Sequence, residues 1–247
     1  MASFAVILPA AGKSSRFRDP FFKKPFAPLE GRAVWVHTAE RFVHRPDVVQ
    51  TILVISPEDR EEFSEKFGAH AALLGVELVD GGTERADSVL RAIEKVRPEA
   101  DYIAVHDAAR PCVTEHAIDE VFAAAVKVGA AILAAPVTAT LKRSTSDQRI
   151  DATVSREMLF EAQTPQVFRR ALLEQAYARR DPQLPSTDDA QLVERLGHPI
   201  KLVSGASTNL KITTQDDLRL AAAILKSAGK SPSSVAPHPF AGDSLWR

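Results

Sequence analysis

The chain has a single cysteine among its 247 residues, so it can form neither an intrachain disulfide nor a zinc site built on several cysteines. Dependence on disulfides is thereby excluded, and we expect the chain to work in the reducing cytoplasm. No run of about 18 apolar residues is present, which argues against a transmembrane helix. The short apolar run at residues 4–8 follows no basic segment, so it does not resemble a signal peptide.

The sequence also lacks an excess of charge of either sign. It has 31 lysines and arginines against 32 aspartates and glutamates, and its formal net charge is -1. Nucleic acids and anionic membranes usually select proteins with a net basic surface. This balance argues against both partners, although a pocket for a small anion needs only a few cations in one place.

Short apolar segments alternate with amphipathic ones through residue 136. We expect strands at residues 4–9, 51–55, 76–79, 102–105 and 131–135. The intervening segments with helical spacing or helix-start signals are residues 33–43, 84–96 and 114–128 and a helix that begins near Ser56. This alternation predicts an α/β fold with a mostly parallel central sheet and helices on both faces.

The alternation ends near residue 138. Residues 138–157 are polar and lack a helical stripe, which predicts a protruding β-arm, with a disordered loop as the alternative. Later segments predict helices at 169–180, 188–196 and 214–226 and a strand at 200–203. We expect one domain over residues 1–226 and a flexible tail, rich in serine and proline, over residues 227–247.

The residues after the first strand suit a phosphate ligand. Ala10, Ala11 and Gly12 have small side chains that let the backbone N–H groups approach such a ligand closely. The loop is not a P-loop, because the Walker pattern requires glycine where Ile7 stands. A cluster of cations follows at residues 16–24, and two cations beside a backbone cradle suit a triphosphate that releases pyrophosphate. An ordinary turn with a solvated charged face is the alternative.

Two further strand ends carry polar motifs. Gly81 and Gly82 allow a close approach to a flat ring, or they simply form a turn. Asp107 and Arg110 follow the fourth expected strand, where an aspartate can hold a ribose, a hydroxyl or a metal, or can close the loop through a salt bridge. We interpret His106 by itself as structural, since a lone histidine seldom marks a site.

Several motifs occur in a fixed order along the chain. They are residues 8–12, Arg16, Lys24, and residues 81–89, 106–111, 135–137, 140–142, 163–166, 187–189 and 209–211. Together they resemble the 2-C-methyl-D-erythritol 4-phosphate cytidylyltransferase family of the non-mevalonate isoprenoid pathway. The resemblance spans roughly residues 4–226, and it implies a Rossmann-like nucleotidyltransferase fold.

The resemblance implies a reaction of CTP with 2-C-methyl-D-erythritol 4-phosphate that yields 4-diphosphocytidyl-2-C-methyl-D-erythritol and pyrophosphate. Mg²⁺ would bridge the phosphates in a cytoplasmic homodimer that joins through the arm at about residues 138–157. The acceptor phosphate is already ionised near pH 7, so the attack needs no general base.

The resemblance also implies the roles of individual residues. The catalytic residues would be Arg16, Lys24 and Lys211. The nucleotide-binding residues would be Ala10, Ala11, Gly12, Gly82, Thr83, Ser88 and Ala108. The substrate-binding residues would be Asp107, Arg110, Thr140, Arg156 and Thr187, with Arg156 supplied by the partner subunit. Mg²⁺ would be held mainly by phosphates, with Asp107 as a possible ligand.

Three alternatives stay open. Lys23 could replace Lys24, because one extra residue precedes this pair relative to the family pattern. The acceptor could instead be a pentitol phosphate such as ribitol 5-phosphate, because few contacts distinguish small polyol phosphates. A non-catalytic nucleotide-binding module is a more distant alternative, since such a module would have little reason to keep Arg16, Lys24 and Lys211 together.

Overall fold

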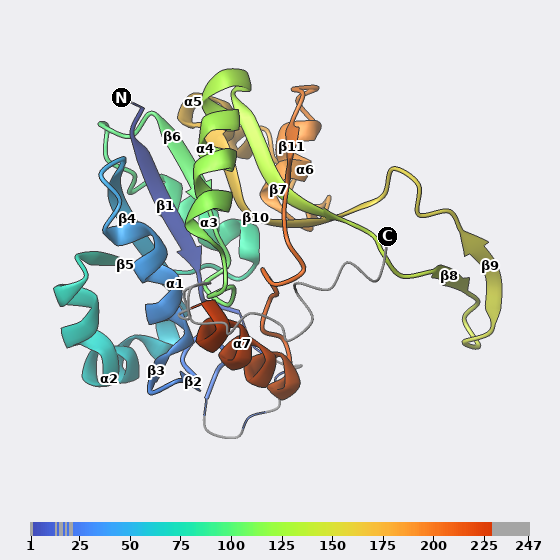
Figure 1. The fold of residues 1–247 in the computed structure, drawn as a ribbon. Coiled ribbons are helices and arrows are strands. Elements are labelled where there is room, and N and C mark those ends of the chain that lie inside the picture. Colours follow the sequence, from blue (N-terminus) through green and yellow to red (C-terminus); the bar gives the residue numbers. More distant parts are fainter. Residues whose placement is uncertain (1, 13, 15–16, 18, 20–21, 229–247) are drawn as a thin grey trace, which may run out of the picture.

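A seven-stranded sheet with the order β11-β7-β10-β6-β1-β4-β5 forms the centre of the fold (Figure 1). The computed structural model describes residues 2–12, 14, 17, 19 and 22–228. The strands are β1 (Phe4–Pro9), β4 (Val48–Ile55), β5 (Val76–Asp80), β6 (Tyr102–Val105), β7 (Ala130–Pro136), β10 (Phe160–Arg169) and β11 (Lys201–Ser204). All the expected strands of this sheet are therefore present, and β10 is an additional one.

The sheet is mostly parallel, as the sequence predicts. β1 pairs in parallel with β4 and β6, and the pairs β4–β5 and β7–β11 are also parallel. β10 runs antiparallel between β6 and β7. The pattern of apolar residues does not reveal β10, because residues 163–166 interrupt it with polar side chains and a proline.

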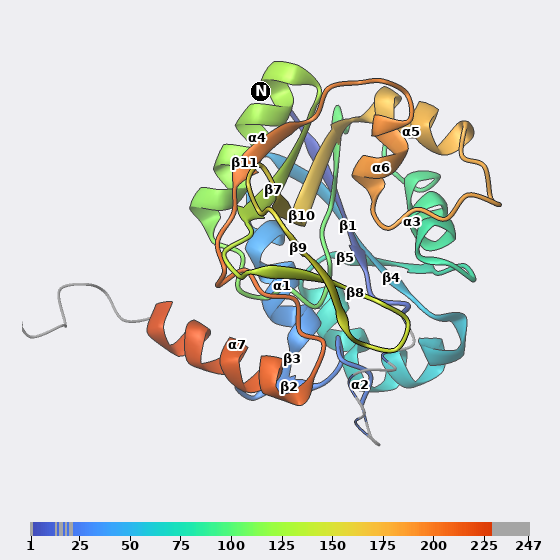
Figure 2. The ribbon, with the colours of Figure 1, turned by 90° about the vertical axis from the view of Figure 1, so that its right-hand side faces the viewer.

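Helices cover both faces of the sheet (Figure 2). α1 (Val34–Val43), α2 (Arg60–Leu73) and α4 (Glu115–Val128) pack on one face, together with Val6 and Leu8 of β1. α3 (Arg85–Ile93), α5 (Arg170–Ala178) and α6 (Asp189–Glu194) pack on the other, together with Ala5 and Ile7. β1 is thus buried on both faces, which explains its continuous apolar sequence.

A third apolar cluster lies beside α7 (Gln215–Ala228), at the end of the sheet where β1 and β6 finish. It joins Phe17 from the loop after β1, Cys112 from the loop after β6, and Ile212 and Ala221 from the C-terminal segment. The hairpin of β2 (Pro28–Leu29) and β3 (Arg32–Ala33) contributes Leu29, and the short 3₁₀ helix η1 (Pro57–Asp59) precedes α2. The cluster therefore holds several loops of this edge together.

The expected arm is a β-hairpin that projects from the body of the protein (Figure 1). β8 (Leu141–Ser144) and β9 (Ile150–Val154) pair antiparallel with each other and not with the central sheet. α7 extends to Ala228, into the segment expected to be a tail, and residues 229–247 lie outside the described part. Among the described residues, no helix has the length and apolar character needed to cross a membrane.

Candidate active site

A cavity of about 520 Å³ opens where β1, β5 and β6 end. Loops that follow these three strands supply most of its lining, and the segment after β11 supplies Lys211. The lining includes Ala10, Ala11, Gly12, Lys24, Glu58, Gly82, Thr83, Arg85, Ser88, Asp107, Ala109 and Lys211. The cavity thus occupies the carboxyl edge of the parallel strands, where ligands of such sheets bind.

The loop after β1 lies so close to the loop after β5 that position 81 has room only for glycine. A Cβ atom on Gly81 would lie 2.7 Å from the Cβ of Ala11 and 2.9 Å from Oγ of Ser88. The loop after β1 could not approach so closely if residue 81 had a side chain. Ser88 then fixes the next residue, because its Oγ accepts a 3.0 Å hydrogen bond from the backbone N–H of Gly82.

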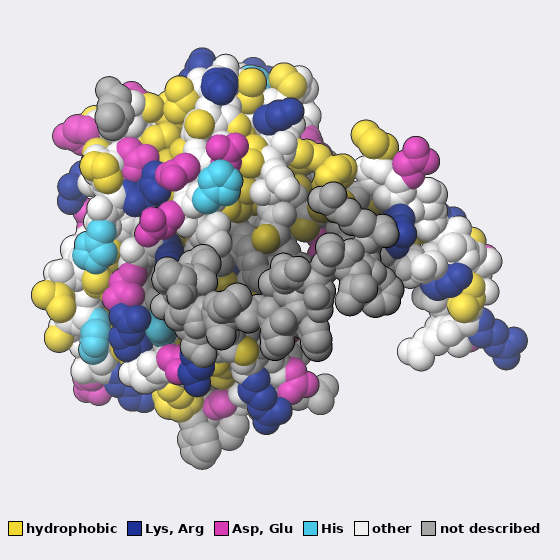
Figure 3. All heavy atoms as spheres, in the orientation of Figure 1, with side chains coloured by type: hydrophobic (Ala, Val, Ile, Leu, Met, Phe, Trp, Pro, Cys, Tyr) yellow, Lys and Arg dark blue, Asp and Glu magenta, His cyan; other side chains and the backbone are white. Residues whose placement is uncertain are grey.

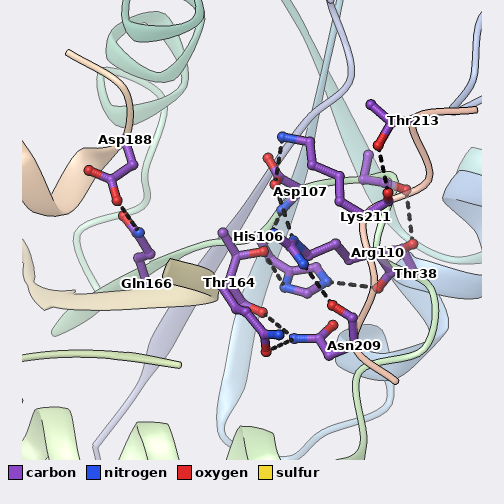
Figure 4. A network of polar contacts seen from close by, with 12 residues as sticks. Thr38, His106, Asp107, Arg110, Thr164, Gln166, Asp188, Asn209, Lys211 and Thr213 are labelled. Carbon is purple, nitrogen blue, oxygen red and sulfur yellow. Dashed lines mark hydrogen bonds and ion pairs between the residues drawn. The ribbon is translucent and has the colours of Figure 1, made fainter. Parts of the chain in front are cut away.

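Asp107 lies at the centre of a group of cations (Figure 4). Nζ of Lys211 is 2.8 Å from its Oδ2 atom, and Nε of Arg110 is 3.4 Å from the same oxygen. Burial by itself would raise the pKa of this carboxyl, but Lys211, Arg85 and Arg110 outweigh burial and hold the pKa well below its usual range. Asp107 is therefore an anion at neutral pH and can only accept hydrogen bonds.

A second, smaller cavity of about 210 Å³ adjoins the first. Arg85, Asp107 and Lys211 line both cavities and form their shared wall. The smaller one is completed by Arg110, Ala162, Gln163, Thr164, Gln166, Thr187 and Asp188. Two ligands bound in these cavities would meet at a wall that carries two cations and one carboxylate.

Arg85 is a residue of the shared wall to which the sequence motifs assign no role. Its Nη2 lies 2.7 Å from Oδ2 of Asp189, which is fully buried, and the hydroxyl of Tyr177 donates to Oδ1 of Asp189 at 2.6 Å. Burial by itself would lower the pKa of the Arg85 guanidinium, but the carboxylates of Asp189 and Asp107 outweigh burial and raise the pKa above its usual value. The sequence contains one signal for this ion pair: Arg85 lies in the motif at residues 81–89, and Asp189 lies in the motif at residues 187–189.

Most of the expected nucleotide-binding residues line the larger cavity. These are Ala10, Ala11, Gly12, Gly82, Thr83 and Ser88. Ala108 is fully buried, and its carbonyl oxygen accepts a 2.9 Å hydrogen bond from Oγ1 of Thr38, whereas Ala109 contributes to the lining. In the segment after β6, Asp107 and Ala109 therefore line the cavity, and Ala108 between them packs behind it.

The structure distinguishes the two adjacent lysines. Lys24 lines the larger cavity, whereas Nζ of Lys23 lies 2.8 Å from the carboxylates of both Glu58 and Asp59. Burial would lower the pKa of Lys23, but these two acids raise it. This arrangement favours Lys24 as the residue that faces a ligand. Arg16, the other expected catalytic cation near it, lies outside the described residues.

The expected substrate-binding residues fall into two groups. Asp107, Arg110 and Thr187 line the smaller cavity. Thr140 and Arg156 lie on the exposed arm and line neither of these two cavities, and Nη1 of Arg156 donates to the carbonyl oxygen of Thr138. Within one chain, the arm residues are therefore not gathered with the others.

The described residues contain no group of three or more histidine, cysteine, aspartate or glutamate side chains placed to hold a metal ion. Asp107, the expected candidate, already carries the ion pair with Lys211.

Comparison with known proteins gives one consistent answer. Residues 4–227 match the family model described as 2-C-methyl-D-erythritol 4-phosphate cytidylyltransferase. A relative with that description from Rhodopirellula baltica is 47% identical over 235 residues, which cover 91% of this chain and 95% of the relative. Another, from Bacillus velezensis, is 40% identical over 225 residues, with 90% and 96% covered.

Solved structures agree with the sequence relatives. A 4-diphosphocytidyl-2C-methyl-D-erythritol synthase is 33% identical, has a TM-score of 0.77, and is matched over 91% of this chain and 99% of its own. The 2-C-methyl-D-erythritol 4-phosphate cytidylyltransferase of Thermus thermophilus is also 33% identical, with a TM-score of 0.71 and coverage of 92% and 100%.

Proposed function

The chain belongs to the 2-C-methyl-D-erythritol 4-phosphate cytidylyltransferase family, and we propose that its two adjoining cavities hold the two substrates of this reaction. The enzyme transfers the cytidylyl group of CTP to 2-C-methyl-D-erythritol 4-phosphate and releases pyrophosphate. The observation that carries the proposal is the wall of Arg85, Asp107 and Lys211 that both cavities share. Substrates held on its two sides would meet there.

CTP binds in the larger cavity. Its volume of about 520 Å³ is within the range of small-ligand sites, about 300–1,000 Å³. The triphosphate lies against Ala10, Ala11 and Gly12, where small side chains expose the backbone. The base and ribose lie near Gly82, Thr83 and Ser88, with Ala108 behind this part of the lining.

The acceptor binds in the smaller cavity. Arg110 and Lys211 attract its phosphate, and the guanidinium of Arg85 adds a third positive charge. The carboxylate of Asp107 and the hydroxyl of Thr187 are hydrogen-bonding partners for hydroxyl groups of the substrates. The small volume of about 210 Å³ suits a short polyol chain.

In the chemical step, a phosphate oxygen of the acceptor attacks the α-phosphorus of CTP. The bond from this phosphorus to the bridging oxygen breaks, and its electron pair leaves with pyrophosphate. The acceptor phosphate is ionised at about pH 7, so no proton has to be removed. Lys24 and Lys211, with Arg16, stabilise the negative charge that develops on the oxygens, and catalysis depends on charge and positioning.

We propose Mg²⁺ as the cofactor, bound mostly by phosphate oxygens. When bound, it neutralises phosphate charge and orients the leaving group. Asp107 of the shared wall could contribute an oxygen, but its carboxylate is already engaged by Lys211. The residues of the chain would therefore act on the ion mainly by fixing the phosphates.

We also propose a homodimer joined through the arm. Large apolar side chains are exposed on the arm and just after it: Ile150 of β9 is 69% exposed, and Met158 and Phe160, which follow the arm, are 83% and 44% exposed. Figure 3 shows hydrophobic and basic side chains on this projecting segment, away from the body. Burial of such side chains favours association. An arm packed against a partner subunit would bring Thr140 and Arg156 to the smaller cavity of that partner. The free, buried thiol of Cys112 is compatible with a cytoplasmic dimer.

The test is a pyrophosphate-release assay with CTP and 2-C-methyl-D-erythritol 4-phosphate, in the presence and absence of Mg²⁺. We expect release that requires both substrates and the metal. Ribitol 5-phosphate is the control acceptor, and equal or better turnover with it would reverse the assignment of the acceptor. Binding of CTP without turnover of either acceptor would instead support a non-catalytic module.

A further inference from the structure

His106 precedes Asp107 and is fully buried under the wall that the two cavities share. It lines neither cavity, so it does not contact a substrate bound in them. Both nitrogens of its ring have partners (Figure 4). Nδ1 lies 3.1 Å from Oγ1 of Thr164, and Nε2 lies 3.1 Å from the carbonyl oxygen of Arg110.

These partners fix the position of the ring proton. The carbonyl oxygen of Arg110 can only accept a hydrogen bond, so Nε2 of His106 carries the proton. When the ring is neutral, Nδ1 has a lone pair and accepts a hydrogen bond from the hydroxyl of Thr164. The Oγ1 atom of Thr164 in turn accepts a 3.1 Å hydrogen bond from the backbone N–H of Asp107.

The chain of hydrogen bonds therefore begins and ends on one short turn. It runs from the amide of Asp107 through Thr164 and His106 to the carbonyl of Arg110. The turn is closed directly as well, because the amide of Arg110 donates to the carbonyl oxygen of Asp107 at 3.0 Å. In a neutral ring, the Nε2–H form gives each of these hydrogen bonds one donor and one acceptor, whereas the Nδ1–H form would leave Nε2 without a proton opposite the carbonyl oxygen of Arg110.

We propose that His106 is a positioning residue for cytidylyl transfer: with Thr164, it fixes the turn that directs the side chains of Asp107 and Arg110 toward the shared wall. The inference rests on the proposed function of that wall. Asp107 orients Lys211 through its ion pair, and Arg110 is held further by the carbonyl oxygen of Asn209 at 2.6 Å. A shift of the turn would thus displace three charged side chains at once.

Neighbouring packing limits other motions of the ring. The ring of Phe42 lies 5.1 Å from that of His106, centroid to centroid, and Thr38 of the same helix binds the carbonyl oxygen of Ala108. Misplacement of catalytic groups by about 1 Å can reduce the rate about 100-fold. His106 therefore affects the reaction through the residues it holds.

The experiment compares three substitutions of this histidine. His106→Phe keeps a ring but removes both hydrogen bonds. The amide nitrogen of His106→Gln can take the place of Nε2 and donate to Arg110, whereas the side-chain oxygen of His106→Asn can accept from Thr164. We expect His106→Phe to lower kcat and raise the KM for the acceptor, with kcat/KM for the acceptor reduced about 10-fold or more. His106→Gln should recover part of this loss.

His37→Phe is the matched control. His37 is also buried, its Nε2 binds the carbonyl oxygen of Leu29 at 2.7 Å, and it lines neither of the two cavities. We expect its variant to lose stability without a change in either KM. If folded His106→Phe retains the wild-type constants, or loses only as much turnover as its folded fraction explains, the positioning role is refuted. An inactive wild-type chain would instead contradict the proposed function.

A second measurement needs no variant. Nitrogen-15 NMR of the imidazole ring in the wild-type protein distinguishes the two neutral tautomers and the cation. We expect the Nε2–H tautomer at neutral pH. A neutral ring with its proton on Nδ1 would lose the hydrogen bond to the carbonyl oxygen of Arg110 and would overturn the proposal even if all three variants fail to fold.

Discussion

Lys211 and Asp107 form a 2.8 Å ion pair across the wall between the two cavities. The aspartate follows β6 and the lysine follows β11, so the pair joins two segments that are distant in the sequence. If CTP and the acceptor occupy the two cavities as proposed, the ammonium group of Lys211 lies within reach of both sets of phosphates, and the ion pair holds its flexible stem in place before either substrate binds.

Replacement of Lys211 should therefore impair catalysis more than folding. We expect Lys211→Ala to lower kcat/KM for pyrophosphate release about 100-fold or more, because a cation is lost from the shared wall. Loss of this cation should also raise the pKa of Asp107, because Lys211 contributes the largest of the Coulombic effects that lower it. The control is Lys201→Ala, which removes an exposed lysine from β11. Equal activity of the two variants would contradict this role.

The two adjacent lysines should respond differently to substitution. Lys24→Ala removes a cation from the larger cavity, and we expect pyrophosphate release to fall about 100-fold or more with the fold intact. Lys23→Ala removes ion pairs with Glu58 and Asp59, which are worth about 0–1 kcal/mol when partly exposed. Its turnover should stay near the wild-type value. The reverse result would assign catalysis to Lys23.

The buried carboxylate of Asp189, which pairs with Arg85, should be important for stability. Asp189→Asn leaves the guanidinium without its anionic partner, and we expect a loss of about 3 kcal/mol in the free energy of unfolding. Tyr177→Phe removes one hydrogen bond to Asp189 and should cost less, about 1–2 kcal/mol. Urea unfolding of both variants measures these values. A larger loss for Tyr177→Phe would show that the hydroxyl, not Arg85, is the main partner of Asp189.

The proposed dimer predicts complementation between two inactive variants. Lys24→Ala impairs the body of one subunit, and Arg156→Ala impairs the arm. Mixed and re-equilibrated, they should recover about a quarter of wild-type activity, because about half of the dimers are mixed and each mixed dimer has one intact site. Sedimentation checks that both variants are dimers. No recovery from dimeric variants would mean that the arm serves its own subunit.

Burial of His106 should make the metal-free protein sensitive to acid. Burial lowers the pKa of this histidine to about 4 in the folded chain, against about 6.5 when unfolded. Its contribution to stability is thus complete above pH 6.5 and is lost as the pH falls from about 6.5 to 4, by about 3 kcal/mol in total. Burial also lowers the pKa of His37, which adds to the effect.

Urea unfolding between pH 7 and pH 5 tests this pH dependence. The free energy of unfolding of the wild-type protein should fall over this range more steeply than that of His106→Gln, which lacks the titrating group. The slope is about 1.4 kcal/mol per pH unit for one proton. Identical slopes for the two proteins would show that another group governs the acid sensitivity.

The sequence reveals those parts of the fold whose signals are local. The apolar run of residues 4–9 and the helical spacing of residues 114–128 are such signals, and both elements are present as β1 and α4. Thr114 caps α4, because its side chain accepts a hydrogen bond from the amide of Ala117. β10 is different, because the burial of Gln166 depends on partners outside its own segment. Its side chain donates to Asp188 and accepts from the amides of Asp189 and Ala190. Hydrogen bonds between distant segments leave no signal in the periodicity of apolar residues, so the sequence pattern does not predict this strand.

The same reasoning applies to the site. The small residues after β1 and the glycines after β5 indicate a cavity because their small size is visible in the sequence itself and does not depend on a distant partner. The choice between Lys23 and Lys24 depends on where Glu58 and Asp59 lie, and the role of Arg85 depends on Asp189. These are contacts between segments that only the folded chain brings together.

The single cysteine has a use that follows from the cluster beside α7. Cys112 is buried there, its Sγ lies 3.8 Å from the carbonyl oxygen of Ala221, and burial raises the pKa of its thiol to about 11. A thiol reagent can reach it only when this cluster opens, because the thiolate must be exposed in order to react. Phe17 and Ile212 belong to the same cluster, and their segments also contribute Lys24 and Lys211 to the lining of the larger cavity. The labelling rate of one native side chain thus reports how often the walls of the active site separate.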